Sequence, residues 1–97
     1  MIKDLENEFT GTSSTKGFQY LKLESGEQGF LYQVTTWENG IHYEVFSKKL
    51  VPICIDFATH QYSDTDFKYV YPKDEDFGKW AWCIVDYNKA IEKFKSL

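Results

Sequence analysis

Arginine is missing from this chain, because all eleven basic residues among its 97 are lysines. Bidentate recognition of phosphates, carboxylates and guanine edges relies on the planar guanidinium group, which lysine replaces only as a point charge. Fifteen acidic residues also give the chain a net charge of −4, and this charge repels a nucleic-acid backbone. The composition therefore predicts no double-stranded nucleic acid as a partner.

A long apolar run is missing as well. No window approaches the roughly 20 apolar residues of a membrane-spanning helix, and residues 1–9 lack the apolar core of a signal peptide. We therefore expect a cytoplasmic protein without a membrane partner. The chain has two cysteines, Cys54 and Cys83, and both should be reduced in that compartment.

Motifs that carry chemistry are also missing. Long and irregular gaps separate the possible metal ligands His42, Cys54, His60 and Cys83. These gaps lack the paired C-x-x-C or H-x-x-x-H spacing that pre-organises a metal site. Neither cysteine lies in a context that lowers a thiol pKa, and no glycine-rich phosphate loop occurs. We predict no catalytic residue, no metal and no cofactor.

Aromatic residues, by contrast, make up 19% of the chain. Tyrosine and phenylalanine dominate this group and favour β-strands, which indicates a sheet with large side chains on at least one face. The length fits one domain, residues 1–97. Within it, residues 10–17 are small, polar and bounded by glycine, which is typical of a mobile loop.

The spacing of apolar residues predicts an α+β fold. Ile2, Leu5 and Phe9 recur at helical spacing, which indicates a short N-terminal helix. The period then becomes two, and strands are expected over 18–24, 29–37, 50–58 and 67–71, with another strand after Asn39-Gly40. We predict a mostly antiparallel sheet of about five strands, with the N-terminal helix and a C-terminal helix packed on one face.

The C-terminal stretch changes from strand to helix at Asp86. Apolar residues over 80–85 occupy both faces of a strand, which predicts burial on both sides, with Trp80, Trp82 and Ile84 sharing one face. Asp86 is a favourable N-cap, and the helical spacing that follows comprises Tyr87, Ala90, Ile91, Phe94 and Leu97. Because Trp82 should then lie in the core, Trp82→Ala should cost about 3–5 kcal/mol.

A β-hairpin is expected at Asn39-Gly40, because both central positions of a type I′ turn need a positive φ. A two-residue loop places Glu38 opposite Ile41 and fixes the register. One face of the hairpin is then half exposed and forms a candidate partner-binding surface of Trp37, His42, Glu44 and Phe46. An acidic turn offers a second candidate surface, consisting of Asp74, Glu75 and Asp76.

Two classes of function fit these observations. The favoured hypothesis is a non-catalytic protein-binding or regulatory module whose partner is another protein or a second copy of the chain. The alternative is a small-molecule-binding domain or a small enzyme that uses His42 or His60 with a nearby carboxylate, in a pocket lined by tyrosines. A weaker alternative is the binding of single-stranded nucleic acid on an aromatic sheet face.

Overall fold

Two β-sheets and one α-helix make up the computed structural model over the residues it describes, which are 2–12, 15–56 and 58–97. The larger sheet has the strand order β2 (Glu8–Thr10), β3 (Gln19–Ser25), β4 (Gly29–Thr35), β5 (Ile41–Ser47) and β8 (Ala81–Ile84), all antiparallel. The smaller sheet has the order β1 (Ile2–Lys3), β7 (Gln61–Tyr69) and β6 (Leu50–Asp56). The α+β class and the antiparallel sheet agree with the prediction.

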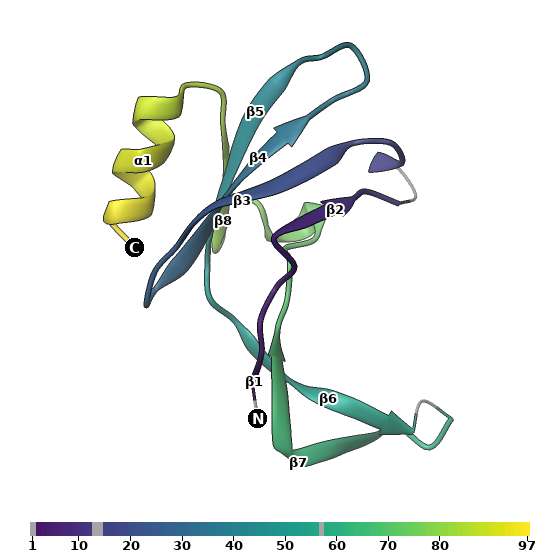
Figure 1. Ribbon diagram of the computed structural model, residues 1–97. Helices are drawn as coiled ribbons and strands as arrows, with labels where there is room; N and C mark the ends of the chain where they lie inside the picture. The colour runs from purple at the N-terminus through teal and green to yellow at the C-terminus, as the bar shows by residue number, and fades with distance from the viewer. Residues whose placement is uncertain (1, 13–14, 57) are drawn as a thin grey trace.

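The larger sheet and helix α1 (Tyr87–Lys95) form what we call the body. Figure 1 shows α1 lying along one face of the sheet. On that face Leu31 and Val45 are fully buried beneath Ala90, with Phe94 and Leu97 packed around them. The predicted C-terminal helix on one face of the sheet is therefore confirmed.

The N-terminus of α1 follows the expected capping chemistry. The Asp86 carboxylate accepts a hydrogen bond from the Lys89 backbone N–H at 2.9 Å, which satisfies one of the free donors of the first turn. Lys93 and Lys95 lie in the last turn, where positive charge interacts favourably with the helix dipole. Local sequence therefore specifies both ends of this helix.

The opposite face of the body sheet carries most of the aromatic residues. Its fully or almost fully buried residues are Tyr20, Phe30, Tyr32, Val34, Phe46 and Ala81. The Tyr32 and Phe46 rings stack with their centroids 5.7 Å apart, and Tyr71 lies edge-on against both. Phe9, Phe77 and Trp80 cover this face. The aromatic excess therefore fills a core.

The predicted N-terminal helix is wrong, because residues 2–10 form β1, an extended link and β2. A helix this short is marginal in water, whereas the edges of two sheets offer backbone partners. The link is held by the Lys22 ammonium, which donates to the Leu5 carbonyl at 2.7 Å, and by the Tyr32 hydroxyl, which donates to the Glu6 carbonyl at 2.6 Å.

The hairpin forms where predicted, but its register is wrong. The Thr36 backbone N–H donates to the Gly40 carbonyl, so the loop has three residues and contains Trp37. Asn39 alone of the Asn-Gly pair has a positive φ, of 60°. Val34 therefore lies opposite His42, and the register moves by three residues. Because an odd shift exchanges the faces of a strand, Phe46 is buried in the aromatic core.

The strand before α1 is shorter and more exposed than predicted. It is the edge strand β8, and Cys83 and Val85 are exposed, so burial on both faces is wrong. Trp80 packs against Phe46 with ring centroids 6.3 Å apart, whereas the Trp82 ring lies 3.9 Å from the Lys93 ammonium of α1. The two tryptophans therefore lie on opposite faces of the body sheet.

The smaller sheet, which we call the arm, extends away from the body (Figure 1). Its strand β6 lies at the sheet edge, where the proline at position 52 is tolerated because no neighbouring strand needs its missing N–H. The radius of gyration is 14.4 Å, whereas a compact chain of this length has about 12.5 Å. The arm accounts for this elongation. No helix among the described residues is long and apolar enough to cross a membrane.

Candidate functional site

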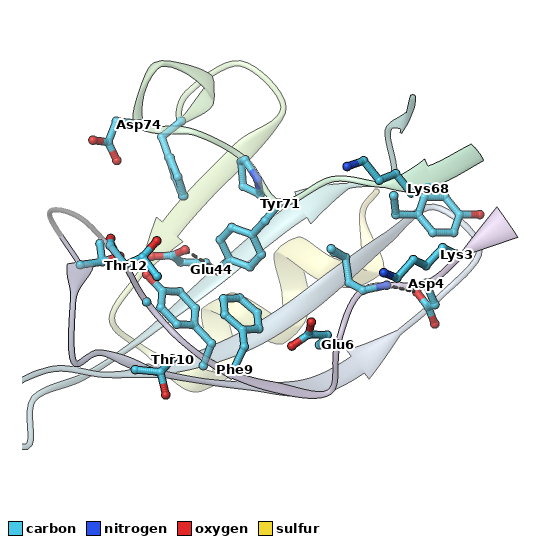
Figure 2. Close-up of a pocket in the computed structure, with 17 residues that line it drawn as sticks. Lys3, Asp4, Glu6, Phe9, Thr10, Thr12, Glu44, Lys68, Tyr71 and Asp74 are labelled. Atoms are coloured by element: carbon cyan, nitrogen blue, oxygen red, sulfur yellow. Dashed lines mark hydrogen bonds between the residues drawn. The ribbon is translucent and has the colours of Figure 1, made fainter. Parts of the chain in front are cut away.

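A cleft of about 600 Å³ lies between the N-terminal link and the aromatic face of the body. Phe9, Tyr20 and Tyr71 contribute apolar walls. Figure 2 shows the cleft with Glu44 and Asp74 toward one end and Lys3 and Lys68 toward the other. Asp4 lies beside Lys3, and Glu6 also lines the cleft, so acidic groups are spread along the cleft while the two lysines lie toward one end.

The tyrosines of this region are held as neutral phenols. Burial raises the pKa of Tyr71 far above its ordinary value, and the neighbouring Glu44 carboxylate raises it further. Burial also raises the pKa of Tyr20 and of Tyr32. A phenol that keeps its proton donates hydrogen bonds to anions. Accordingly, the Tyr71 hydroxyl donates to Glu44 Oε1 at 2.5 Å.

Glu44 is the buried charged residue of the site. Only 9% of it is exposed, and its second oxygen, Oε2, lies 2.8 Å from His42 Nε2. His42 and Glu44 are two positions apart on β5, so they share a face of the sheet. Cys83 lies directly opposite Glu44 on β8. Sheet pairing therefore brings an imidazole, a carboxylate and a thiol together.

The thiol of this cluster is not activated for nucleophilic attack. Burial raises the pKa of Cys83, and the negative charge of Glu44 raises it further. At neutral pH the side chain is therefore a protonated thiol, whereas a catalytic cysteine needs a lowered pKa and a thiolate. Cys54, the other free cysteine, lies on the arm in β6.

The predicted hairpin surface is divided by the observed register. Trp37 is 67% exposed in the hairpin loop, where its indole N–H donates to the Lys16 carbonyl at 2.5 Å. His42 and Glu44 instead belong to the polar cluster, and Phe46 is completely buried. Of the four residues, Trp37 is therefore the one that presents a large apolar surface to solvent.

The acidic turn forms a short 3-10 helix, Asp74–Asp76. Asp74 and Glu75 are exposed, and the Asp76 carboxylate accepts a hydrogen bond from the Lys73 backbone N–H at 2.9 Å. This hydrogen bond lowers the pKa of Asp76. Asp74 also lines the cleft. Asp76 therefore caps the turn, Glu75 is exposed to solvent, and Asp74 is exposed at the wall of the cleft.

The two histidines lie in different parts of the molecule. His60 is in the β6–β7 turn of the arm, with a positive φ of 54°, and His42 is in the body. Among the described residues that line the cleft, neither histidine is present, although Glu44 connects His42 to it. The expected mobile loop, 10–17, includes residues 13 and 14, which lie outside the described part of the chain. Thr10 belongs to β2.

One face of the arm is apolar, and it is the surface that the sequence did not reveal. Ile2, Phe67 and Pro52 lie side by side across the three strands, so their side chains share a face. Ile2 is 53% exposed, and Leu50, two positions from Pro52, is 46% exposed. Toward the turn, Tyr62 is 54% exposed and lies opposite Cys54, whereas Ile55, the residue after Cys54, is 68% exposed on the other face of the arm. Large apolar side chains therefore face solvent along the whole arm.

The outer edge of the arm is less suited to strand addition. The Val70 N–H donates to the Lys49 carbonyl, and the pairing then continues with Val51 opposite Lys68. Because hydrogen-bonded pairs alternate in an antiparallel ladder, the backbone nitrogen and carbonyl of Pro52 point away from β7, toward the open edge. Proline has no N–H to offer there. The edge of the arm therefore lacks a backbone donor at Pro52 for an added strand.

Comparison of the chain with protein-family models, with curated proteins and with solved structures found no match. The arm, the cleft and the polar cluster of His42, Glu44 and Cys83 are therefore the features of the molecule that indicate a function.

Proposed function

We propose that this chain is a non-catalytic protein-binding module that presents the exposed apolar side chains of the arm to a partner protein. The observation that carries the proposal is the exposure of four large apolar side chains on one small sheet, Ile2, Leu50, Ile55 and Tyr62. An isolated two-stranded hairpin is at best marginally stable in water without a layer packed on it, and β1 adds only two residues to the arm as a third strand. The arm lacks such a layer within the described residues, and a partner surface would supply it.

The chemistry of the arm indicates the kind of partner. Asp56 and Asp64 are exposed beside Ile55 and Tyr62 near the turn. A complementary surface is therefore an apolar patch bordered by lysine or arginine, since charge complementarity guides protein association. Trp37, in the hairpin loop of the body, is a further exposed aromatic side chain that a large partner could contact.

The test is site-specific capture from cells that express the protein. Tagged wild-type chain is compared with Ile55→Asp and with Val85→Asp, which changes an equally exposed apolar side chain on the body. We expect one protein to be captured by the wild type and by Val85→Asp, and to be lost with Ile55→Asp. Equal capture by all three variants would refute a binding role for the arm.

A second copy of the chain is the competing occupant of the arm. Light scattering at high protein concentration distinguishes the two cases, because a monomer mass excludes self-association through the arm. A dimer mass that returns to the monomer in Ile55→Asp would assign the arm to self-association and contradict the proposed partner protein.

The cleft supports a second candidate function, the binding of a small molecule. Its volume of about 600 Å³ lies within the range of about 300–1,000 Å³ typical of ligand sites. Its lining combines four carboxylates with two lysines, which favours a ligand that carries both charges. A ligand found by thermal-shift screening should lose its effect in Lys68→Glu and keep it in Lys95→Glu. Equal shifts in both variants would exclude the cleft.

The aromatic residues of the body give less support to single-stranded nucleic acid. Phe30, Tyr32 and Phe46 are fully buried, so their faces cannot stack on bases without opening the core.

A further inference from the structure

We infer that His42, Glu44 and Cys83 form a binding site for a divalent transition-metal ion, with zinc as the best match. One ligand atom from each of these residues lies within 4.8 Å of the other two. Imidazole nitrogen, carboxylate oxygen and cysteine sulfur are the three donor types that zinc uses in proteins. The inference departs from the sequence, whose spacing predicted no metal, and goes beyond the proposed binding role of the arm.

The backbone already places the three ligating residues side by side. His42 and Glu44 project from one face of β5, and Cys83 projects from the residue opposite Glu44 on β8. Zinc bonds of about 2.0–2.3 Å at tetrahedral angles place ligand atoms roughly 3.3–3.6 Å apart. His42 Nε2 and Glu44 Oε2 are 2.8 Å apart, and the widest separation in the cluster is at most 4.8 Å. Side-chain rotations alone can therefore close the site.

The buried carboxylate gives an independent reason for a cation. Buried charges are normally paired or bound to a metal, and no lysine in the described part of the chain forms an ion pair with Glu44. Its hydrogen-bond partners are the Tyr71 hydroxyl and the His42 ring. A metal ion at Oε2 would replace the contact with His42 and supply positive charge.

Tyr71 serves as a positioning residue for this site. Its hydroxyl donates to Glu44 Oε1 at 2.5 Å and leaves Oε2 toward His42. Hydrogen bonds of this kind orient ligating carboxylates, and their loss typically lowers metal affinity by about 10–100-fold. Access is provided by the exposed side of Cys83 on edge strand β8. Three protein ligands leave the fourth position of a tetrahedral zinc ion to solvent.

The experiment is titration of the reduced, metal-free full chain with zinc and, separately, with cobalt(II). Calorimetry should show one zinc ion per chain, and cobalt should produce the near-ultraviolet charge-transfer band of a cobalt–thiolate bond. Cys83→Ser should remove that band and weaken zinc binding by at least about 10-fold, and His42→Gln should weaken zinc binding to a similar degree.

The chain provides its own matched controls, because it has one further cysteine and one further histidine. Cys54→Ser and His60→Gln should leave the stoichiometry, the affinity and the cobalt band unchanged. Tyr71→Phe should keep the cobalt band and weaken zinc by about 10–100-fold. Absence of stoichiometric zinc binding by the wild type would overturn the inference. So would a cobalt band that survives Cys83→Ser in a variant with native circular dichroism.

Discussion

The body and the arm bury their side chains in opposite ways. In the body, α1 covers one face of the sheet. The N-terminal link, Phe77 and Trp80 cover the other face, so both faces are closed. The arm is a three-stranded sheet on which four large apolar side chains, Ile2, Leu50, Ile55 and Tyr62, remain 46–68% exposed. Burial of apolar area is the main source of stability. The body should therefore be stable by itself, whereas the arm should depend on contact with another surface.

The largest expected effect comes from the aromatic core of the body. Phe46→Ala removes a fully buried ring that contacts Phe30, Tyr32 and Tyr71. We expect a loss of about 3–5 kcal/mol in the free energy of unfolding, because the truncation leaves a cavity. Urea denaturation measures this loss. A change below about 1 kcal/mol would show that the aromatic face is not a packed core.

A smaller effect is expected at the edge of the body. Trp82 is half-buried on β8 and stacks with the Lys93 ammonium. Trp82→Ala should cost about 2 kcal/mol, since part of the burial energy and a cation–π contact are lost. This loss of unfolding free energy is smaller than the loss of about 3–5 kcal/mol expected if Trp82 lay in the core as the sequence alone predicted. Denaturation curves for Trp82→Ala and Phe46→Ala, recorded together, test the order of the two effects.

The helix cap should contribute less again. Asp86→Ala removes the acceptor for the Lys89 N–H and should cost about 1 kcal/mol. Asp86→Asn keeps a capping oxygen and serves as the control, so it should lie close to the wild type. Thermal unfolding compares the three chains. Equal destabilisation by Ala and Asn would indicate that charge, and not capping, explains the effect.

The smallest effect is expected on the arm. Ile55→Ala truncates a side chain that is already 68% exposed, so the free energy of unfolding should change by no more than about 0.5 kcal/mol. Capture of the partner protein should nevertheless weaken. A loss of stability comparable to that of Phe46→Ala would show that the apolar residues of the arm are buried in the isolated chain.

Local signals predicted part of this fold well. Asp86 and the helical spacing after it specify α1, because capping and amphipathic packing depend on residues close in sequence. Asn39-Gly40 correctly marked a hairpin, but the loop runs from Trp37 to Asn39, and Gly40 already pairs with Thr36. Three-residue loops of this type also place one residue in the left-handed region. The dipeptide therefore could not determine the register, and the faces of β5 were exchanged.

The candidate sites depend on pairing between distant segments, which the sequence does not show. Cys83 meets Glu44 only because β8 pairs with β5. Ile2 follows helical spacing with Leu5, yet it pairs beside Phe67 on the arm. In both cases a tertiary neighbour decided the environment of the residue. The chemical types of the ligands were readable from the sequence, and their proximity was not.

The comparison between body and arm is tested most directly by native-state hydrogen exchange of the isolated full chain. Opening free energies report how strongly each segment is held in the folded state. We predict that the amides of β4 and β5 exchange only on global unfolding, whereas those of β6 and β7 exchange through a separate opening of lower free energy. Equal protection across all four strands would show that the arm is self-sufficient and would contradict the account.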